Sequence, residues 1–359
     1  MKAAVLSAFG SPLSVESVPD PTLGTGEVIV DVVAAGVLPY AADVLSGKRR
    51  HLLTLPVAPG AGAVGRVRAV GPDATRLAAG DWVLCDPTVR SRDDPLTPDI
   101  TLQGLSARGD GGLRLQRHFG QGSFAEQLLV PTENAFPLGS VDLAHAGRWT
   151  ALNLCLVPYG GLLAADLKAG ETVLVSGATG NFGSAGVAVA LAMGAGCVVA
   201  PGRNQDMLTE LERRFGSRLR TVTLSGDEDQ DRERMTQAAP GPIDVVLDLL
   251  PPSAGTTPVR AAAMTVREYG RVVLMGGVGM LGGDDLALPY PWIMRNSITV
   301  RGQWMYPPQA NTRLIELARS GLLDLGQFDV TEFALDDAAK AIAHAADSNG
   351  RFTLTVIRP

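Results

Sequence analysis

Two patterns of hydrophobic positions divide the chain. From Met1 to about Ser140, short apolar runs alternate with breaks that contain proline and glycine, which predicts a mostly β region. The strands expected there span residues 2–7, 14–17, 27–34, 63–70, 82–85 and 123–130. A polar segment, residues 88–122, is expected to be a long loop. Loops of that length are either functional or mobile, so its role stays open.

From residue 143 the pattern changes to alternating helices and apolar strands. The expected strands are 172–176, 197–201, 219–224, 243–250, 271–275 and 298–302, and the expected helices are 184–193, 206–215, 230–238 and 257–269. Helices at 313–319 and 336–346 and a strand at 352–357 follow. Repeated strand–helix units are typical of a parallel, doubly wound sheet, so the fold class is α/β, with a β-rich part and a Rossmann part.

A turn of small residues joins the strand at 172–176 to its helix. Its members are Gly177, Ala178, Thr179, Gly180, Asn181, Phe182 and Gly183, with the spacing Ala-x-Gly-x-x-Gly. Glycine lets the backbone approach a pyrophosphate, and the helix start offers N–H groups to the phosphates. A plain glycine turn is the alternative. The strand, turn, helix and strand together favour a dinucleotide-binding site.

The residues after the second strand predict which dinucleotide binds. An NAD site usually has an acidic residue there, which binds the ribose 2′-hydroxyl. This chain has Gly202, Arg203 and Asn204, with no acid before Asp206. A guanidinium pairs well with a 2′-phosphate, so we expect NADP(H). The alternative is that Arg203 is a solvated loop residue.

Composition and charge exclude several classes of protein. Hydrophobic residues make up 46% of the chain and charged residues 19%, which is typical of a globular protein. A net charge of −6 argues against binding to nucleic acid or to anionic membranes. The first nineteen or so residues lack the apolar core of a signal peptide, and the three cysteines are widely spaced. We expect a cytoplasmic protein without disulfides.

Several short stretches, taken in order, resemble the medium-chain dehydrogenase/reductase family over nearly the whole chain. They are Lys2-Ala3-Ala4-Val5, Gly26-Glu27-Val28 with Ala35-Gly36-Val37, residues 65–71 followed by Gly80-Asp81-Trp82-Val83, Gly122-Ser123-Phe124-Ala125-Glu126, and residues 168–175. The resemblance implies a GroES-like catalytic domain (1–140 and 311–359) and a Rossmann NADP-binding domain (141–310). It also implies an active site in the cleft between them.

The chain departs from the zinc-binding members of that family. Where they have a cysteine, this chain has Leu38, and Gly60-Ala61-Gly62 replaces their Gly-His-Glu. Asn153 and Cys155 lie where a third ligand is expected, and a catalytic zinc needs three protein ligands. We therefore expect no metal. The chain resembles the zinc-free quinone oxidoreductase-like branch, which includes alkene and enone reductases.

The resemblance also points to residues that contact cofactor and substrate. It places Tyr159 in a loop beside the nicotinamide, and Gly276, Gly277 and Val278 at the carboxamide. Trp304 and Tyr306 are candidate walls of the substrate cleft, although aromatic residues there are equally consistent with core or interface. The strand at 298–302 corresponds to one that relatives pair across a two-fold axis, so we expect a homodimer.

Tyr40 is the candidate proton donor, because zinc-containing relatives keep a hydroxyl at that position. A phenol can donate to a developing enolate oxygen, but a packed tyrosine is an equal alternative. A basic cluster, Lys48, Arg49 and Arg50, lies nearby with Asp43 and His51; it suits either an acidic substrate or a solvated loop. The function expected is NADP(H)-dependent reduction of a quinone, enone or other activated alkene. A zinc-free carbonyl reductase or alcohol dehydrogenase and a non-catalytic NADPH-binding protein are the alternatives.

Overall fold

A computed structural model describes residues 1–348 and 352–359, and it contains two compact units. Of the described residues, unit 1 comprises 1–153, 325–348 and 353–359, and unit 2 comprises 154–324 and 352. The expected domains divided the chain at 140/141 and 310/311. The observed boundaries lie later because residues 141–153 associate with unit 1, whereas helix α10 (Ala310–Arg319) associates with unit 2.

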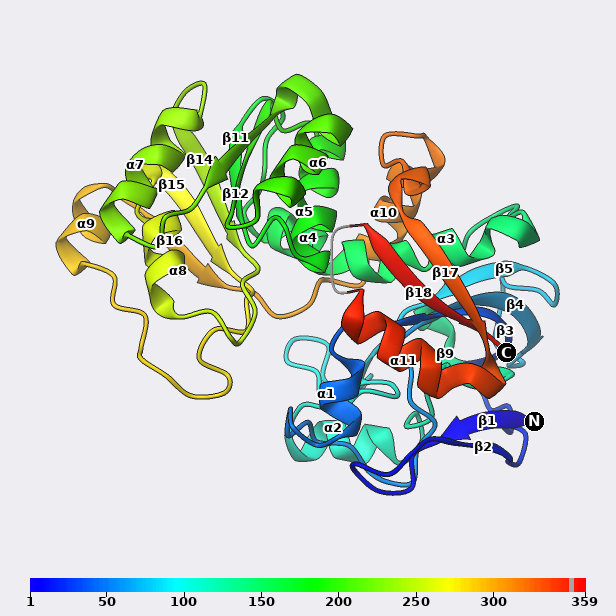
Figure 1. The fold of residues 1–359 in the computed structure, drawn as a ribbon. Helices are drawn as coiled ribbons and strands as arrows, with labels where there is room; N and C mark the ends of the chain where they lie inside the picture. The colour runs from blue at the N-terminus through cyan, green and yellow to red at the C-terminus, as the bar shows by residue number, and fades with distance from the viewer. Residues whose placement is uncertain (349–351) are drawn as a thin grey trace. The chain divides into compact units, whose positions relative to one another are not determined.

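Unit 1 is built on a mostly antiparallel sheet with the strand order β10-β5-β4-β3-β18-β17, with β9 also paired to β3. Its strands are β3 (Glu27–Val37), β4 (Ala63–Val70), β5 (Trp82–Cys85), β9 (Gln127–Pro131), β10 (Ala135–Pro137), β17 (Asp329–Ala334) and β18 (Thr353–Arg358). The C-terminal strands β17 and β18 thus complete a sheet begun by the N-terminal part of the chain (Figure 1). A separate hairpin joins β1 (Lys2–Val5) to β2 (Ser14–Ser17).

The core of unit 1 consists of small and β-branched side chains on this sheet, packed against α11 (Ala338–Asp347). Val28 and Val30 of β3 and Ala341 of α11 are completely buried. The short helix α1 (Ala41–Leu45) follows β3, and the short helix α3 (Ala146–Trp149) lies between β10 and α4 (Ala151–Ala164). Strand β3 is three residues longer than expected, because Ala35–Val37 continues the pairing to β18.

The segment 88–122 is a folded part of unit 1, so the expectation of a long loop is wrong. It contains β6 (Thr88–Arg90), β7 (Ile100–Leu102), β8 (Ser106–Ala107) and α2 (Gly109–Gln116). The three strands form a small antiparallel sheet. Polar composition concealed these elements because their apolar positions are few, although Val89 and Ile100 are buried.

Unit 2 contains, within the described residues, a six-stranded parallel sheet with the order β13-β12-β11-β14-β15-β16. The strands are β11 (Thr172–Ser176), β12 (Cys197–Gly202), β13 (Leu219–Thr223), β14 (Ile243–Asp248), β15 (Val266–Leu274) and β16 (Thr299–Gly302). The order reverses between β11 and β14, as in a doubly wound Rossmann fold. Ligands of such sheets bind at the carboxyl ends of the strands beside that reversal.

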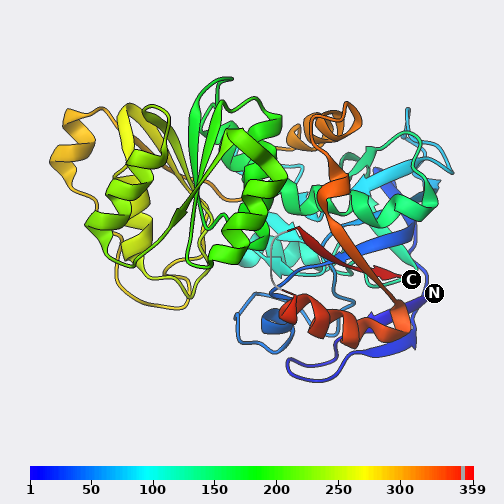
Figure 2. The ribbon, with the colours of Figure 1, turned by 45° about the horizontal axis from the view of Figure 1, so that its top comes forward.

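Helices cover both faces of this sheet, as Figures 1 and 2 show. On one face lie α4 (Ala151–Ala164, which begins at the end of unit 1), α5 (Asn181–Ala192) and α6 (Gln205–Phe215), and on the other lie α7 (Glu228–Ala238) and α8 (Thr256–Ala263). Helix α9 (Tyr290–Arg295) precedes β16. Because both faces are covered, Leu174, Val199 and Val246 of the inner strands are buried.

One expected helix of unit 2 is too long. Residues 257–269 were expected to be helical, but α8 ends at Ala263 and β15 begins at Val266. The Thr265 hydroxyl donates to the Ala262 carbonyl at 2.7 Å and ends the helix. Strand β15 then passes through the exposed residues Glu268 and Tyr269, which interrupt the buried apolar pattern by which strands are recognised.

None of the helices in the described part of the chain combines the length and hydrophobicity needed to cross a lipid bilayer.

Candidate cofactor and substrate sites

The glycine turn of unit 2 connects β11 to α5 at the edge where ligands of such sheets bind. Gly177 has a φ of 86°, and its carbonyl accepts the Gly180 N–H at 2.9 Å. Gly183 permits the helix to approach, because a Cβ there would lie 1.9 Å from the Gly177 carbonyl oxygen. Gly180 precedes α5 without a side-chain cap. Asn181, Phe182 and Gly183, expected in the turn, form the first turn of α5 instead.

The end of β12 lies against this turn. A Cβ on Gly202 would lie 2.6 Å from Thr179 Cγ2, so glycine is required for the close approach. Arg203 is exposed and forms no ion pair with the described part of the chain. Asn204 caps α6, and its Oδ1 accepts the Met207 N–H at 3.1 Å. The guanidinium of Arg203 is therefore available to a ligand, whereas Asn204 already has a structural role.

The expected carboxamide-binding residues follow β15 at the same edge of the sheet. The Gly277 N–H donates to the Leu250 carbonyl at 2.8 Å, so this donor is already used. Gly276 lies against Asp248, the last residue of β14; a Cβ on Gly276 would be 2.4 Å from Asp248 Oδ2. The Gly276–Val278 segment is thus brought to the edge that carries the Gly177 turn.

The aromatic candidates of unit 2 have different environments. Tyr159 lies inside helix α4 rather than in a loop, and 4% of it is exposed. Burial raises the pKa of its phenol. Tyr306 is also buried, with its Cβ near Gly160 of α4, whereas Trp304 is about half exposed. Tyr159 and Tyr306 therefore belong to the packed region around α4.

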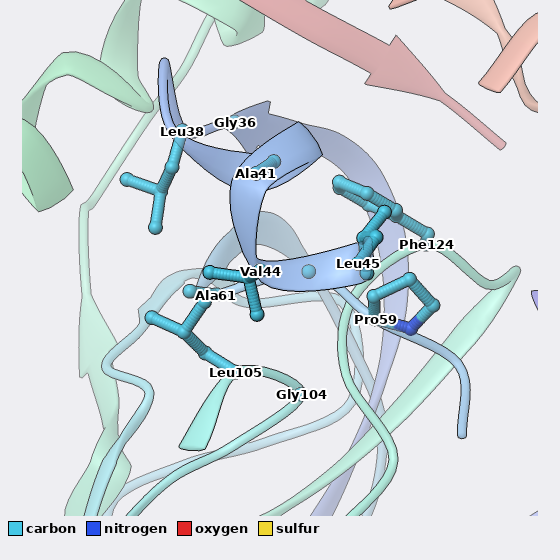
Figure 3. Close-up of a pocket in the computed structure, with 11 residues that line it drawn as sticks. Gly36, Leu38, Ala41, Val44, Leu45, Pro59, Ala61, Gly104, Leu105 and Phe124 are labelled. Carbon is cyan, nitrogen blue, oxygen red and sulfur yellow. The ribbon is translucent and has the colours of Figure 1, made fainter. Parts of the chain in front are cut away.

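Unit 1 contains an apolar pocket, shown in Figure 3. It is lined by Gly36, Leu38, Ala41, Val44, Leu45, Pro59, Gly60, Ala61, Gly104, Leu105 and Phe124. Helix α1 supplies Val44 and Leu45, while Pro59, Leu105 and Phe124 come from loops (Figure 3). Every lining side chain is apolar, so the pocket suits a hydrocarbon part of a ligand.

Tyr40 is the residue before α1, between the pocket-lining residues Leu38 and Ala41. The Arg49 guanidinium lies 4.1 Å from the centre of its ring, and the His51 ring meets it edge-on at 6.5 Å. Burial raises the pKa of the Tyr40 phenol, and the positive charge of Arg49 opposes this shift. The phenol is therefore neutral near pH 7 and carries a proton that it can donate.

The basic cluster near Tyr40 is divided between several roles. Lys48 pairs with Asp43 at 3.1 Å, and Arg49 stacks on Tyr40. Burial lowers the pKa of His51, and its buried Nδ1 has no hydrogen-bond partner among the described residues. Lys48 and Arg50 are both exposed, but the Lys48 charge is paired with Asp43, so the three cations do not form a single anion-binding patch.

The residues at the expected metal position do not fit zinc. Leu38, Gly60 and Ala61 line the apolar pocket, and the Asn153 amide lies against Gly62. Asn153 is a neutral amide rather than an anionic or imidazole ligand. Burial raises the pKa of Cys155, which favours the neutral thiol over the metal-binding thiolate. No group of three or more His, Cys, Asp or Glu side chains suitable for a metal occurs in residues 1–348 and 352–359.

Comparison with known proteins identifies the family. The alcohol dehydrogenase GroES-like domain matches residues 24–140. The chain is 26% identical to the L-threonine 3-dehydrogenase of Streptomyces coelicolor, covering 98% of this chain and 97% of that protein. It belongs to the medium-chain dehydrogenase/reductase family. Its assignment to the zinc-free branch stays a prediction from the sequence.

Two further similarities describe this medium-chain dehydrogenase/reductase. It is 27% identical to the acryloyl-coenzyme A reductase of Metallosphaera sedula over 81% of each chain. The solved structure of an alcohol dehydrogenase from Thermus sp. ATN1 has the same fold, with a TM-score of 0.81, 23% identity and complete coverage of both chains. The protein is therefore an oxidoreductase of this family, for which a nicotinamide cofactor is expected.

A nicotinamide dinucleotide fits the residues present at the Gly177 turn. Gly177, Gly183 and Gly202 leave no side chain between the backbone and a pyrophosphate, and the N-terminal end of α5 points to the same place. Sequence reasoning missed Asp248, because a single aspartate at a strand end carries no motif. It also missed the stacking of Arg49 on Tyr40, which depends on how the loop after α1 folds back.

Proposed function

We propose that this oxidoreductase works without zinc and uses NADP(H) to reduce a quinone, an enone or another activated alkene. The observation that carries the proposal is the apolar pocket at the position where a metal site is expected. Leu38, Gly60 and Ala61 contribute only hydrocarbon surface there. A substrate carbonyl in this pocket meets no Lewis acid, so polarisation has to come from hydrogen bonds.

This constraint favours a conjugated acceptor over a simple ketone. A bound nicotinamide supplies the hydride. In an enone the acceptor carbon is activated through conjugation, so the protein needs only to stabilise charge on the distant oxygen and to deliver a proton. Tyr40 suits that second role, because its phenol is neutral and the nearby Arg49 charge stabilises the phenolate left after donation.

The similarity to an acryloyl-coenzyme A reductase supports reduction of a conjugated double bond, because its name denotes an activated alkene as substrate. The similarity to an L-threonine 3-dehydrogenase favours a second candidate, a zinc-free alcohol dehydrogenase or carbonyl reductase. The two differ in the product formed from the same enone: a saturated ketone in the first case and an allylic alcohol in the second.

The reaction class is tested with chelator-treated protein and a panel of quinones and enones, following NADPH and NADH oxidation. We expect metal-free turnover with NADPH as the better donor. Tyr40→Phe is the comparison variant; it removes the proton but keeps the ring under Arg49. Its kcat should fall about 100-fold while the affinity for NADPH stays unchanged.

Three outcomes of this panel contradict the proposal. Activity that disappears on chelation and returns with zinc overturns the metal-free mechanism. Allylic alcohol as the product favours the carbonyl reductase. Unchanged turnover of Tyr40→Phe removes Tyr40 from proton transfer, whatever the substrate.

The NADP(H) preference rests on Arg203. It is exposed beside Gly202 at the end of β12 and has no ion pair within the described residues. A 2′-phosphate there would gain charge-assisted hydrogen bonds that a 2′-hydroxyl cannot match.

Arg203→Ala should weaken NADPH binding about 10- to 100-fold and change NADH binding by less than about twofold, measured by fluorescence titration. Arg232→Ala is the matched control, because Arg232 pairs with Asp229 on the surface of the same unit. Equal losses for both cofactors would show that Arg203 does not recognise the 2′-phosphate.

We also propose that the chain forms a homodimer through β16. This strand is the edge of the sheet, its one partner among the described strands is β15, and all four of its residues are exposed. An unprotected edge is normally paired or covered. Sedimentation velocity should find a dimer that Val300→Pro converts to monomer, because proline cannot donate to a strand partner. A monomeric wild-type protein at micromolar concentration contradicts this assembly.

A further inference from the structure

Asp248 is a buried carboxyl group whose role is not explained by the family similarity or the proposed reaction. It is the last residue of β14 and is 3% exposed. Its Oδ1 atom has no hydrogen-bond partner among the described residues. A buried hydrogen-bond acceptor without a partner lowers the stability of a folded protein, so the presence of this carboxyl group calls for a functional reason.

Backbone pairing places Asp248 where three strands end. Its register partners are Ser176 in β11 and Leu274 in β15. The Leu249 N–H donates to the Ser176 carbonyl at 3.1 Å, and the Met275 N–H donates to the Asp248 carbonyl at 3.1 Å. Ser176 immediately precedes Gly177 in the chain. Asp248 is therefore paired with the residue from which the turn that fits the pyrophosphate begins.

The Asp248 side chain also contacts the second glycine turn. Its Oδ2 lies 2.4 Å from the position that a Cβ of Gly276 would occupy, so only glycine leaves room for the carboxyl group. The Gly277 N–H is held by the Leu250 carbonyl, two residues after Asp248. One carboxyl group is therefore packed between the two glycine turns at the cofactor edge of the sheet.

The immediate surroundings of Asp248 contain dipoles rather than charges. Burial raises the pKa of Asp248 to about 6, and hydrogen-bond donors at Leu250, Ser176 and Gly276 oppose this shift. No charged side chain contributes to the shift. Asp248 is therefore ionised in most molecules at pH 7, without a cation to balance it.

The charged groups of the elements packed around Asp248 are engaged elsewhere. Glu171, before β11, pairs with Arg271 of β15. Arg260 of α8 pairs with Glu228, and Arg301 of β16 donates to the Ala164 carbonyl at 3.3 Å. On the strands themselves, Asp244 of β14 pairs with Arg267 of β15 at 2.6 Å, and Glu268 is exposed. Arg203, after β12, and Asp284 and Asp285, after β15, are exposed, and α4 and α5 carry no charged residues.

We propose that Asp248 takes up a proton when a nicotinamide dinucleotide binds at the Gly177 turn, and that it thereby makes cofactor affinity depend on pH near neutrality. The pyrophosphate brings two negative charges next to the turn, and like charges disfavour the ionised carboxylate. Linkage is reciprocal, so protonation of Asp248 strengthens cofactor binding to the same extent. This inference rests on the cofactor occupying the Gly177 turn.

The sign of the effect follows from the unliganded protein. Well below pH 6 the carboxyl group is already neutral, and the cofactor binds without a proton change. Above pH 6 most molecules are ionised, and binding draws protons from solution, so affinity falls as the pH rises. If binding raises the Asp248 pKa by one to two units, Kd increases about 5- to 25-fold between pH 6 and pH 8.

The test is calorimetric titration of the full chain with NADH at pH 7, in two buffers that differ in ionisation enthalpy. NADH is the probe because the 2′-phosphate of NADPH itself titrates near pH 6. We expect an uptake of about 0.4 to 0.8 proton per NADH, together with the rise in Kd toward pH 8. Binding without proton uptake and with a constant Kd overturns the inference.

Two variants assign the proton to Asp248. Asp248→Asn has the same shape but cannot ionise, so it should bind NADH without proton uptake and with a Kd constant within about twofold from pH 6 to 8. Ser176→Ala removes a donor that holds the Asp248 pKa down, so the pH at which its proton uptake is greatest should be higher than in the wild type. Asp229→Asn is the control, because it removes an exposed carboxylate of the same unit.

The outcomes separate this inference from the cofactor assignment. Wild-type uptake in Asp248→Asn assigns the proton to another group and overturns the inference alone. If Asp248→Asn does not fold, an unchanged pH of greatest uptake in Ser176→Ala does the same. Failure of the wild-type chain to bind either NADH or NADPH overturns the cofactor site and the inference with it.

Discussion

The close approach of α5 to the end of β11 is the contact on which the cofactor site depends. It exists because Gly183 has no Cβ; a methyl group there would lie 1.9 Å from the Gly177 carbonyl oxygen. The same approach brings the helix start to the carboxyl edge of the sheet, where the strand order reverses. Gly202, at the end of β12, and Gly276, after β15, likewise lack the Cβ that would clash with a neighbouring residue. Backbone rather than side chains therefore forms this edge, which suits a large anionic ligand.

The pocket of unit 1 is apolar, in contrast to the backbone N–H groups and carboxylate at the cofactor edge of unit 2. Where a metal would require anionic or imidazole ligands, Leu38 and Ala61 contribute to an apolar wall. An acceptor that needs little polarisation is compatible with such a wall, and Tyr40 offers a neutral phenol stacked under Arg49 beside it. Asp248 in unit 2 is a buried carboxyl that contacts a glycine turn at the cofactor edge, and its unfavourable charge is removed when it binds a proton. In this proposal the ionisable carboxyl group lies at the cofactor edge of unit 2, and the surface that would bind a hydrocarbon part of the substrate lies in the pocket of unit 1.

The sequence predicted the parallel sheet well, because its strands are continuous apolar runs and its helices begin after glycine or a polar cap. The glycine turn was recognisable for the same reason. The folded segment 88–122 was missed because its strands are only two or three residues long. Tyr159 was expected in a loop, but α4 continues through Pro158, which is usually a helix breaker. The surroundings of Asp248 depend on contacts distant in sequence, and the Arg49–Tyr40 stack depends on the conformation of the loop after α1. No sequence motif indicates either.

The central claim is that this oxidoreductase reduces a conjugated double bond. The most direct measurement uses NADPH carrying deuterium at the transferred position of C4, with an enone as acceptor and NMR analysis of the product. The account predicts deuterium on the β-carbon of a saturated ketone, formed by metal-free protein. Deuterium on the carbinol carbon of an allylic alcohol would contradict it and would identify the chain as a carbonyl reductase.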